Sequence, residues 1–267
     1  MKKIFLYLFI YQLFSNLHAL TFGVVPQQSP FVLMKSWNPI IQYLEKETGE
    51  KIDLKIETSI QKFEEVLYSG GYDIAYMNPY HYVLANEKKD YKAVVKSDKD
   101  LIGILVVNKT SGITQINDLK DKKFLFPSPN ALAATLLTKY ELLKNYHINI
   151  EKDEEFNYVN SHDSVYKGIS RGIGDVGGGI ERTFNALSDE KTKESLMILY
   201  KTQPYPSHPI AFNKSISKEV EKKFIKALMN IPKELLEELS IGNMIETNDK
   251  DYDVIRNIVN DLSLPKK

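Results

Sequence analysis

The chain has 267 residues, with 35 lysine and arginine residues set against 35 aspartate and glutamate residues, and no cysteine. This length allows two domains of ordinary size, and 43% apolar with 26% charged residues are globular values that argue against a disordered or fibrous chain. The absence of cysteine excludes disulfides, thiol nucleophiles, cysteine-ligated metals and a lipid on an N-terminal cysteine, and the zero net charge gives no general attraction for nucleic acid, so we expect no nucleic-acid partner.

The first 19 residues are typical of a secretory signal peptide. Lys2 and Lys3 precede an apolar run at 4–11, and a small residue, Ala19, stands at the expected cleavage point. The apolar run is too short for a membrane-spanning helix, which needs about 20 residues. Cleavage would leave 33 basic against 35 acidic residues, a net charge of −2. We therefore expect an exported, periplasmic protein without a lipid anchor.

After this segment, short β-like runs alternate with amphipathic helices, which is the pattern of an α/β fold. The expected strands are 20–25, 51–57, 72–77, 91–97, 101–108, 123–126, 155–159, 175–177 and 196–202. The expected helices are 37–46, 60–68, 79–86, 131–145, 163–171, 180–187, 217–231, 232–239 and 249–262. Two strands in succession, 91–97 and 101–108, interrupt the alternation and precede a second α/β unit.

This order predicts two lobes, each a mixed sheet flanked by helices. Residues 20–106 and 205–267 would form lobe 1, and residues 107–204 would form lobe 2, inserted into it. The two chain crossings would act as a hinge. Ligands of open α/β sheets bind beyond the carboxyl ends of the strands, so we expect a ligand cleft between the lobes.

Two glycine motifs suggest enzymes but stand in the wrong context. Gly168 to Gly172 matches G-x-S-x-G, yet Ser170 lies within a predicted helix instead of on a turn after a strand. Residues 172–177 match G-x-G-x-x-G, but these glycines precede a strand instead of opening a helix. A periplasmic hydrolase using Ser170 or Ser128 with His162 stays open as an alternative. We predict a protein that is not an enzyme and has no metal and no cofactor.

The stronger signal lies where strands give way to helices. At Ser128, Asn130 and Ala131 a strand meets a helix whose first turn has free backbone N–H groups, and such an N-terminus attracts anions. Ser128 or Asn130 would cap this helix. His162 stands at a second junction of the same kind. Several junctions that converge on one cleft would make a binding site.

Further junction residues complete the predicted set. Tyr76 stands at the end of the strand 72–77 and Asn78 directly follows it, Gly177 to Gly179 offer a backbone that a ligand can approach, and Arg182 lies in the next helix. His208 stands near the second crossing. The predicted ligand-binding residues are Tyr76, Asn78, Ser128, Asn130, Ala131, His162, Arg182 and His208.

These junctions resemble those of the phosphate, phosphite and phosphonate-type substrate-binding proteins of ABC importers, which are two-lobed type II periplasmic binding proteins. The resemblance covers the chain after residue 19. It rests on the sequences FGVVPQQSP, WNPIIQYLEKETG, YDIAYMNPYHY, KKFLFPSPNALAAT, SHDSVYKGISRGIGDVGGGIERTF and YPSHPIAF.

The resemblance implies a type II periplasmic binding protein fold, a ligand-contacting histidine at His162 and an aromatic contact at Tyr76. In the family, a Ser-Thr-Ser run holds the phosphonate, and the matching positions here are Ala131, Leu132 and Ala133, which have no hydroxyl groups. Phosphonate specificity is therefore not implied.

The sequence thus predicts a monomeric solute-binding protein that captures a small anionic ligand for an ABC permease. GGGIERTF and the PSHP stretch also resemble a branch that includes sensory input domains. Presentation of an oxyanion to a membrane sensor histidine kinase is accordingly the alternative.

Overall fold

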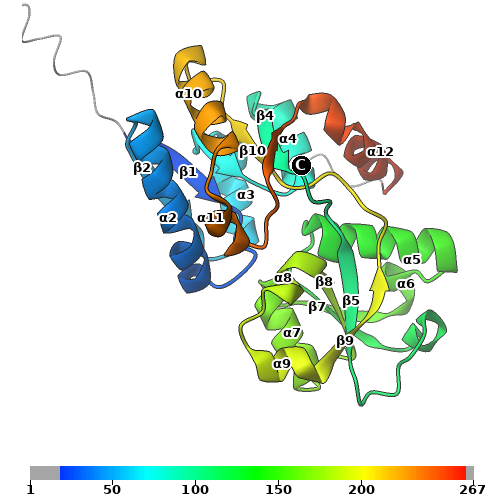
Figure 1. The fold of residues 1–267 in the computed structure, drawn as a ribbon. Helices are drawn as coiled ribbons and strands as arrows, with labels where there is room; N and C mark the ends of the chain where they lie inside the picture. The colour runs from blue at the N-terminus through cyan, green and yellow to red at the C-terminus, as the bar shows by residue number, and fades with distance from the viewer. Residues whose placement is uncertain (1–18, 263–267) are drawn as a thin grey trace, which may run out of the picture.

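The computed structural model describes residues 19–262, which form two lobes joined by two chain crossings (Figure 1). Each lobe is a mixed sheet flanked by helices, which confirms the predicted fold class. The predicted signal peptide lies outside the described residues, apart from Ala19. Of the helices described, none has the combined length and apolarity that crossing a membrane requires.

Lobe 1 is built on a six-stranded sheet in the order β11-β4-β10-β3-β1-β2. Its strands are β1 (Leu20–Val24), β2 (Ile52–Ile56), β3 (Ile74–Tyr76), β4 (Lys92–Ser97), β10 (Pro209–Phe212) and β11 (Met244–Glu246). Its helices are α2 (Pro30–Thr48), α3 (Ile60–Ser69), α4 (Pro79–Lys89), α10 (Lys218–Met229), α11 (Lys233–Glu237), the 3₁₀ turn η3 (Asp249–Tyr252) and α12 (Asp253–Asp261). Strands β1, β2 and β3 are parallel, so their carboxyl ends share one edge of the sheet.

Three helices start directly beyond these parallel strands, and each start is capped by a side chain. Ser29, Ser59 and Asn78 accept hydrogen bonds from backbone N–H groups in the first turns of α2, α3 and α4. Helix α2 begins seven residues before the predicted 37–46, because Ser29 and Pro30 form a favourable start. The caps fix the chain at the sheet edge that faces lobe 2.

Lobe 2 is built on a five-stranded sheet in the order β7-β6-β8-β5-β9. Its strands are β5 (Gly103–Asn108), β6 (Lys123–Phe126), β7 (Glu155–Tyr158), β8 (Val176–Ile180) and β9 (Leu196–Lys201). Its helices are the 3₁₀ turn η1 (Ile116–Leu119), the π-helical segment η2 (Leu132–Leu137), α5 (Thr138–Tyr146), α6 (Ile150–Asp153), α7 (His162–Ser170), α8 (Glu181–Asn185) and α9 (Glu190–Ser195). Strands β6, β7 and β8 are parallel.

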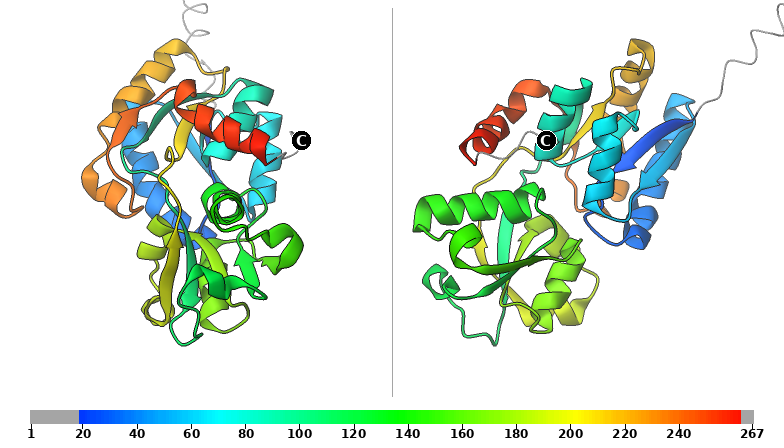
Figure 2. Two further views of the ribbon diagram at one scale, coloured as in Figure 1. Left: turned by 90° about the vertical axis from the view of Figure 1, so that its right-hand side faces the viewer. Right: turned by 180° about the vertical axis from the view of Figure 1, so that it is seen from behind.

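The boundary of lobe 2 differs from the predicted 107–204. Strand β5 pairs along its length with β8 and β9, so residues 103–106 belong to the sheet of lobe 2 and not to lobe 1. The crossings are therefore 98–102 and 202–208. They pair with each other through Leu101 and Tyr205, whose backbone N–H and C=O groups exchange bonds of 2.8 and 3.0 Å. Both crossings run side by side between the lobes (Figure 2).

Two strands were not predicted. Strand β10 begins at the last of three closely spaced prolines (204, 206 and 209), where no strand was expected, and it inserts between β3 and β4. Pro209 is tolerated because it is the first residue of the strand. Strand β11 has three residues at the sheet edge, too few for an alternating pattern. Both strands depend on partners far away in the sequence.

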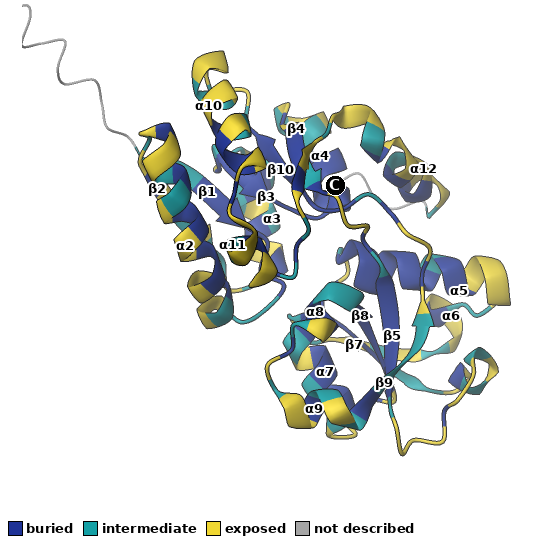
Figure 3. Cartoon of the chain, in the orientation of Figure 1, coloured by how far each residue is buried: buried dark blue, intermediate teal, exposed yellow. Residues whose placement is uncertain are grey.

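The predicted helix 131–145 is divided, and its first part is π-helical. In η2 the N–H of Leu136 reaches back five residues to the carbonyl of Ala131, at 3.3 Å. This segment packs closely against strands β5 and β8, which are buried (Figure 3). A Cβ atom on Gly178 would lie 2.1 Å from the carbonyl oxygen of Ala134. Gly178 therefore accommodates η2, Gly177 and Gly179 lie against side chains of α7, and none of the three leaves the expected room for a ligand.

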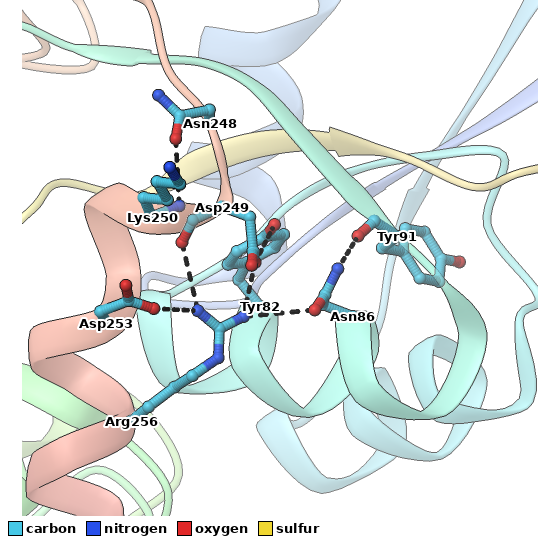
Figure 4. Close-up of polar contacts among 8 residues, drawn as sticks. All are labelled: Tyr82, Asn86, Tyr91, Asn248, Asp249, Lys250, Asp253 and Arg256. Carbon is cyan, nitrogen blue, oxygen red and sulfur yellow. Dashed lines mark hydrogen bonds and ion pairs between the residues drawn. The ribbon is translucent and has the colours of Figure 1, made fainter.

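The C-terminal helix returns to lobe 1 and is fixed to α4 (Figure 4). The guanidinium group of Arg256 contacts Asp249, donates to Asp253 at 2.9 Å and donates to Asn86 at 3.2 Å. The hydroxyl of Tyr82 donates to the same Asp249 carboxylate at 2.8 Å. These contacts tie the last part of the described chain to the helix that follows β3.

The second crossing is anchored to lobe 2 by a buried carboxylate. Glu141 of α5 accepts hydrogen bonds from the hydroxyls of Tyr200 and Tyr205, at 2.6 and 2.9 Å, and from the backbone N–H of Gln203 at 3.0 Å. Hydrogen bonds to an ionised acceptor contribute about 1.5–3 kcal/mol each. Residues 203–205 are thereby held to lobe 2.

We expect Glu141→Gln to lower the free energy of unfolding by about 2–3 kcal/mol, because the amide loses the charge and cannot accept at both atoms. Urea unfolding monitored by circular dichroism measures this loss. The control Tyr200→Phe removes one donor and keeps the carboxylate, so its cost should be about 1 kcal/mol. Equal stability of Glu141→Gln and the unmodified chain would contradict the anchoring role.

Candidate functional site

Two cavities lie next to each other between the lobes, and some residues line both of them. The first, which we name the hinge-side chamber, has a volume of about 690 Å³. The second, the inner chamber, has about 10 Å³, which is room for about one water molecule. Ile180 and His208 line both chambers.

Lobe 1 contributes side chains that follow the parallel strands. Gln27 follows β1 and lines the inner chamber, as does Asn78 after β3. Tyr76, the last residue of β3, lines the hinge-side chamber and is 4% exposed. Its ring lies between those of Trp37 and His208, with centroids at 4.9 and 5.4 Å. The aromatic stack fixes this end of β3.

Lobe 2 contributes the first turn of η2, but its start differs from the prediction. Ala131, Leu132 and Ala133 line the inner chamber. No side chain caps this segment, although Ser128 or Asn130 was expected to do so. The N–H of Ala131 donates to the carbonyl of Ser128 at 3.4 Å, so it is not free for a ligand. The π-helical geometry, with its packing on β8, replaces the expected cap.

Arg182 of α8 and Gln27 connect the two lobes at the junction of the chambers. The guanidinium donates to the side-chain oxygen of Gln27 at 2.7 Å and to the carbonyl of Leu239 at 3.2 Å. The side-chain nitrogen of Gln27 lies 2.9 Å from Nε2 of His208. Because an amide nitrogen can only donate, His208 accepts at Nε2 and carries its proton on Nδ1.

The two histidines of the site are uncharged. Burial, with a smaller contribution from the nearby Arg182 charge, lowers the pKa of His162 to about 3. Burial likewise lowers the pKa of His208 well below its ordinary value, helped by Arg182, His81 and His162. Nδ1 of His162 is buried without a hydrogen-bond partner. This atom is available to a bound molecule in the inner chamber.

Several hydrogen bonds close the lobes around the site. The backbone N–H of His162 donates to the carbonyl of Gln27 at 3.1 Å. The side-chain amide of Asn78 donates to the carbonyl of Asn130 at 3.1 Å, and that of Asn130 donates to Glu64 at 3.0 Å. The described conformation is therefore a closed one.

The structure brings six of the eight predicted residues to the chamber walls. The exceptions are Ser128 and Asn130, which line neither chamber. The hydroxyl of Ser128 is buried without a partner, while Asn130 joins the lobes through Glu64. Gln27, Ile180 and Glu64 also lie at this site and were not predicted. Only Gln27 had a usable signal, because it lies three residues after the end of the first parallel strand.

The hydrolase arrangement is not formed. Ser170 is the last residue of α7, and its hydroxyl lies 2.8 Å from the hydroxyl of Ser195. Neither Ser170 nor Ser128 hydrogen-bonds to His162. Within residues 19–262, no group of three or more histidine, aspartate or glutamate side chains is placed to hold a metal ion.

Comparisons with known proteins agree with this architecture. A family model described as "ABC transporter, phosphonate, periplasmic substrate-binding protein" matches residues 22–252. The phosphonates-binding periplasmic protein of Escherichia coli K12 is 26% identical over 229 residues, which cover 80% of this chain and 67% of that protein. A probable ABC transporter phosphite binding protein of Prochlorococcus marinus is 22% identical, over 92% of this chain and 90% of the relative.

A solved structure gives the same fold. PhnD1 of Prochlorococcus marinus, in complex with methylphosphonate, superimposes with a TM-score of 0.86 at 19% identity, over 93% of this chain and 99% of that one. The match to the family model extends over nearly the whole described region, so the predicted resemblance is confirmed. This chain belongs to the family of periplasmic substrate-binding proteins of phosphonate-type ABC transporters.

Proposed function

We propose that this chain captures a small anionic solute between its lobes in the periplasm and delivers it to the permease of an ABC importer. The observation that carries the proposal is the convergence of polar groups from both lobes on one place, all of them buried except the half-buried Arg182. Gln27 and Asn78 come from lobe 1, His162 and Arg182 come from lobe 2, and His208 comes from the second crossing. A ligand held by all of them would stabilise the closed state.

Arg182 supports the anionic character of the ligand. Its guanidinium contacts two neutral oxygen atoms and forms no ion pair with a carboxylate of the described chain. An unpaired positive charge at the junction of two cavities favours a negatively charged group. The names of the relatives support the importer as partner, since they describe ABC transporter and import proteins. We therefore place the sensor-kinase alternative second.

The proposal includes a monomer as the working unit. We also propose binding without turnover, because neither serine of the hydrolase alternative is paired with His162. Ester hydrolysis that is lost in Ser170→Ala would contradict this reading.

We expect a thermal-shift screen with phosphate, phosphite, methylphosphonate, sulfate and short carboxylates to find an anion that stabilises the protein. At a hundredfold excess over Kd, a ligand adds about 2.7 kcal/mol to the free energy of unfolding. Small-angle X-ray scattering should show that the same anion makes the protein more compact. If only neutral or cationic compounds raise the midpoint, the proposed function is wrong.

The same ligand should bind about tenfold more weakly to His162→Ala, because His162 lines the inner chamber and its Nδ1 is buried without a hydrogen-bond partner. His147→Ala is the matched control, since His147 is an exposed histidine of the same lobe. Equal affinity of the two variants would show that the ligand lies elsewhere.

A further inference from the structure

A connected set of polar side chains joins the lobes beside the inner chamber. Glu64 of α3 accepts a hydrogen bond from the side-chain amide of Asn130 at 3.0 Å, and its other carboxylate oxygen lies 2.9 Å from Nε2 of His81 in α4. Asn130 belongs to lobe 2, between β6 and η2, whereas Glu64, His81 and Asn78 belong to lobe 1. We name these four residues the lobe latch. Of the four, only Asn78 lines a chamber.

The lobe 1 side of the latch is held firmly in place. His81 is fully buried, and its ring packs against that of Phe63, with the centroids 5.7 Å apart. Its backbone N–H donates to the side-chain oxygen of Asn78 at 2.8 Å. Because an ionised carboxylate can only accept, His81 donates to Glu64 from Nε2. The side chain of Glu64 is 12% exposed, so its second oxygen has little access to water in place of Asn130.

The lobe 2 side of the latch is the turn between β6 and η2. Asn130 is held there at two atoms, because its carbonyl accepts from the side-chain amide of Asn78 at 3.1 Å while its own amide donates to Glu64. The next three residues, 131–133, line the inner chamber. The latch therefore places this wall of the chamber against lobe 1.

The latch favours the closed state of the two lobes. Separation of the lobes would break both bonds of Asn130, while Glu64 would keep only its bond from His81. A hydrogen bond to an ionised acceptor stabilises more than one between neutral groups. A ligand held by both lobes binds to the closed state, so its apparent affinity falls when the population of that state falls.

We infer that Glu64 is a positioning residue for ligand capture, which holds Asn130 to lobe 1 and thereby sets the population of the closed state. Glu64 and Asn130 line neither chamber, so they act on affinity without touching the ligand. The effect on affinity rests on the proposed function, whereas the effect on closure does not.

Double electron–electron resonance between spin labels on the two lobes tests the effect on closure. The chain has no cysteine, so Lys46→Cys and Lys191→Cys each place one label on an exposed helix position, in lobe 1 and lobe 2. With no anion added, the ratio of short to long distances should fall about tenfold in Glu64→Ala. An unchanged distance distribution would overturn the inference, even if the unfolding midpoint of the variant falls, because a role confined to the stability of lobe 1 would produce that result.

Isothermal titration of the full chain with methylphosphonate and with phosphate tests the effect on affinity. Glu64→Ala and Asn130→Ala should each weaken binding about tenfold, and the double variant should bind about as weakly as either one, because both residues act through one bond. Equal affinity of Glu64→Ala and the unmodified chain would overturn the inference and leave the proposed function standing.

Glu64→Gln should restore the latch and keep the affinity within about threefold of the unmodified chain. The glutamine oxygen can accept from Asn130, and its amide can donate to Nε2 of His81. The imidazole proton then moves to Nδ1, which has no partner in the described chain, so no existing hydrogen bond is lost. A loss as large as that of Glu64→Ala would mean that the charge of Glu64 acts instead of its bonds, and would overturn the inference.

Glu65→Ala is the matched control, because Glu65 is the next residue of α3 and is exposed. It should change neither the distance ratio nor the affinity by more than about twofold. Equal effects of Glu64→Ala and Glu65→Ala would refute the role of Glu64. If the distances change as expected but no anion of the thermal-shift screen binds, the latch is present and the proposed function is wrong.

Discussion

Replacement of Gly178 by alanine is expected to destabilise lobe 2 by about 3 kcal/mol or more. The new Cβ atom would lie 2.1 Å from the carbonyl oxygen of Ala134 and 2.4 Å from the ring of Phe126. The ring can shift, but the carbonyl belongs to the backbone of η2, so the whole segment must move. Urea unfolding monitored by circular dichroism should show the loss, and the yield of folded protein should fall.

Gly172→Ala is the control for this substitution. Gly172 has a φ of +73° and nothing within 4 Å of its Cβ position, so alanine there costs only backbone strain, about 1 kcal/mol. If both variants lost the same stability, the close packing of η2 on β8 would not be the cause. Because η2 carries the wall of the inner chamber, Gly178→Ala should also disturb ligand binding in whatever protein still folds.

Stability should depend on pH through the two buried histidines. Above pH 6.5 both are neutral in the folded and unfolded states. As the pH falls, the unfolded chain binds protons near 6.5, whereas burial keeps the pKa of His162 at about 3 and that of His208 well below its ordinary value. The free energy of unfolding should therefore decrease between pH 6.5 and 5, with a slope approaching about 1.4 kcal/mol per pH unit for each histidine.

The double variant His162→Gln and His208→Gln tests this assignment. Urea unfolding at intervals between pH 7.5 and 5 gives the slope, which should be smaller in the double variant, whatever its absolute stability. Other titrating groups are common to both proteins, so they cancel in the comparison. An unchanged slope would mean that these two imidazoles do not cause the pH dependence.

The fold was largely predictable because its strands and helices carry local patterns. The sequences of β1, β2 and β6 are either mainly apolar or alternate between apolar and polar residues, and the helices that follow β1 and β2 begin with recognisable caps. Strands β10 and β11 were missed, because three or four residues do not show a period and because the prolines around β10 resemble a loop. The start of lobe 2 differed from the prediction because only the pairing of β5 with β8 and β9 assigns β5 to lobe 2.

The site was predictable in part. Tyr76, Asn78, Ala131, His162, Arg182 and His208 were identified from their places at strand ends or crossings, and all six line the chambers. Ser128 and Asn130 were predicted by the same reasoning but do not line them. The side-chain amide of Asn130 donates to Glu64 instead, and the hydroxyl of Ser128 is buried without a hydrogen-bond partner.

The sequence by itself determined the α/β class, the family and the absence of hydroxyl groups at residues 131–133, because each of these is a property of residue type and order. The tertiary structure decided which groups are free to bind. Gln27 meets Arg182 and His208 across 155 and 181 residues of sequence, and its bond to Arg182 joins the two lobes. Burial then makes the histidines neutral and leaves one guanidinium charge beside a large cavity. Those are effects of distance and desolvation, which residue order alone does not encode.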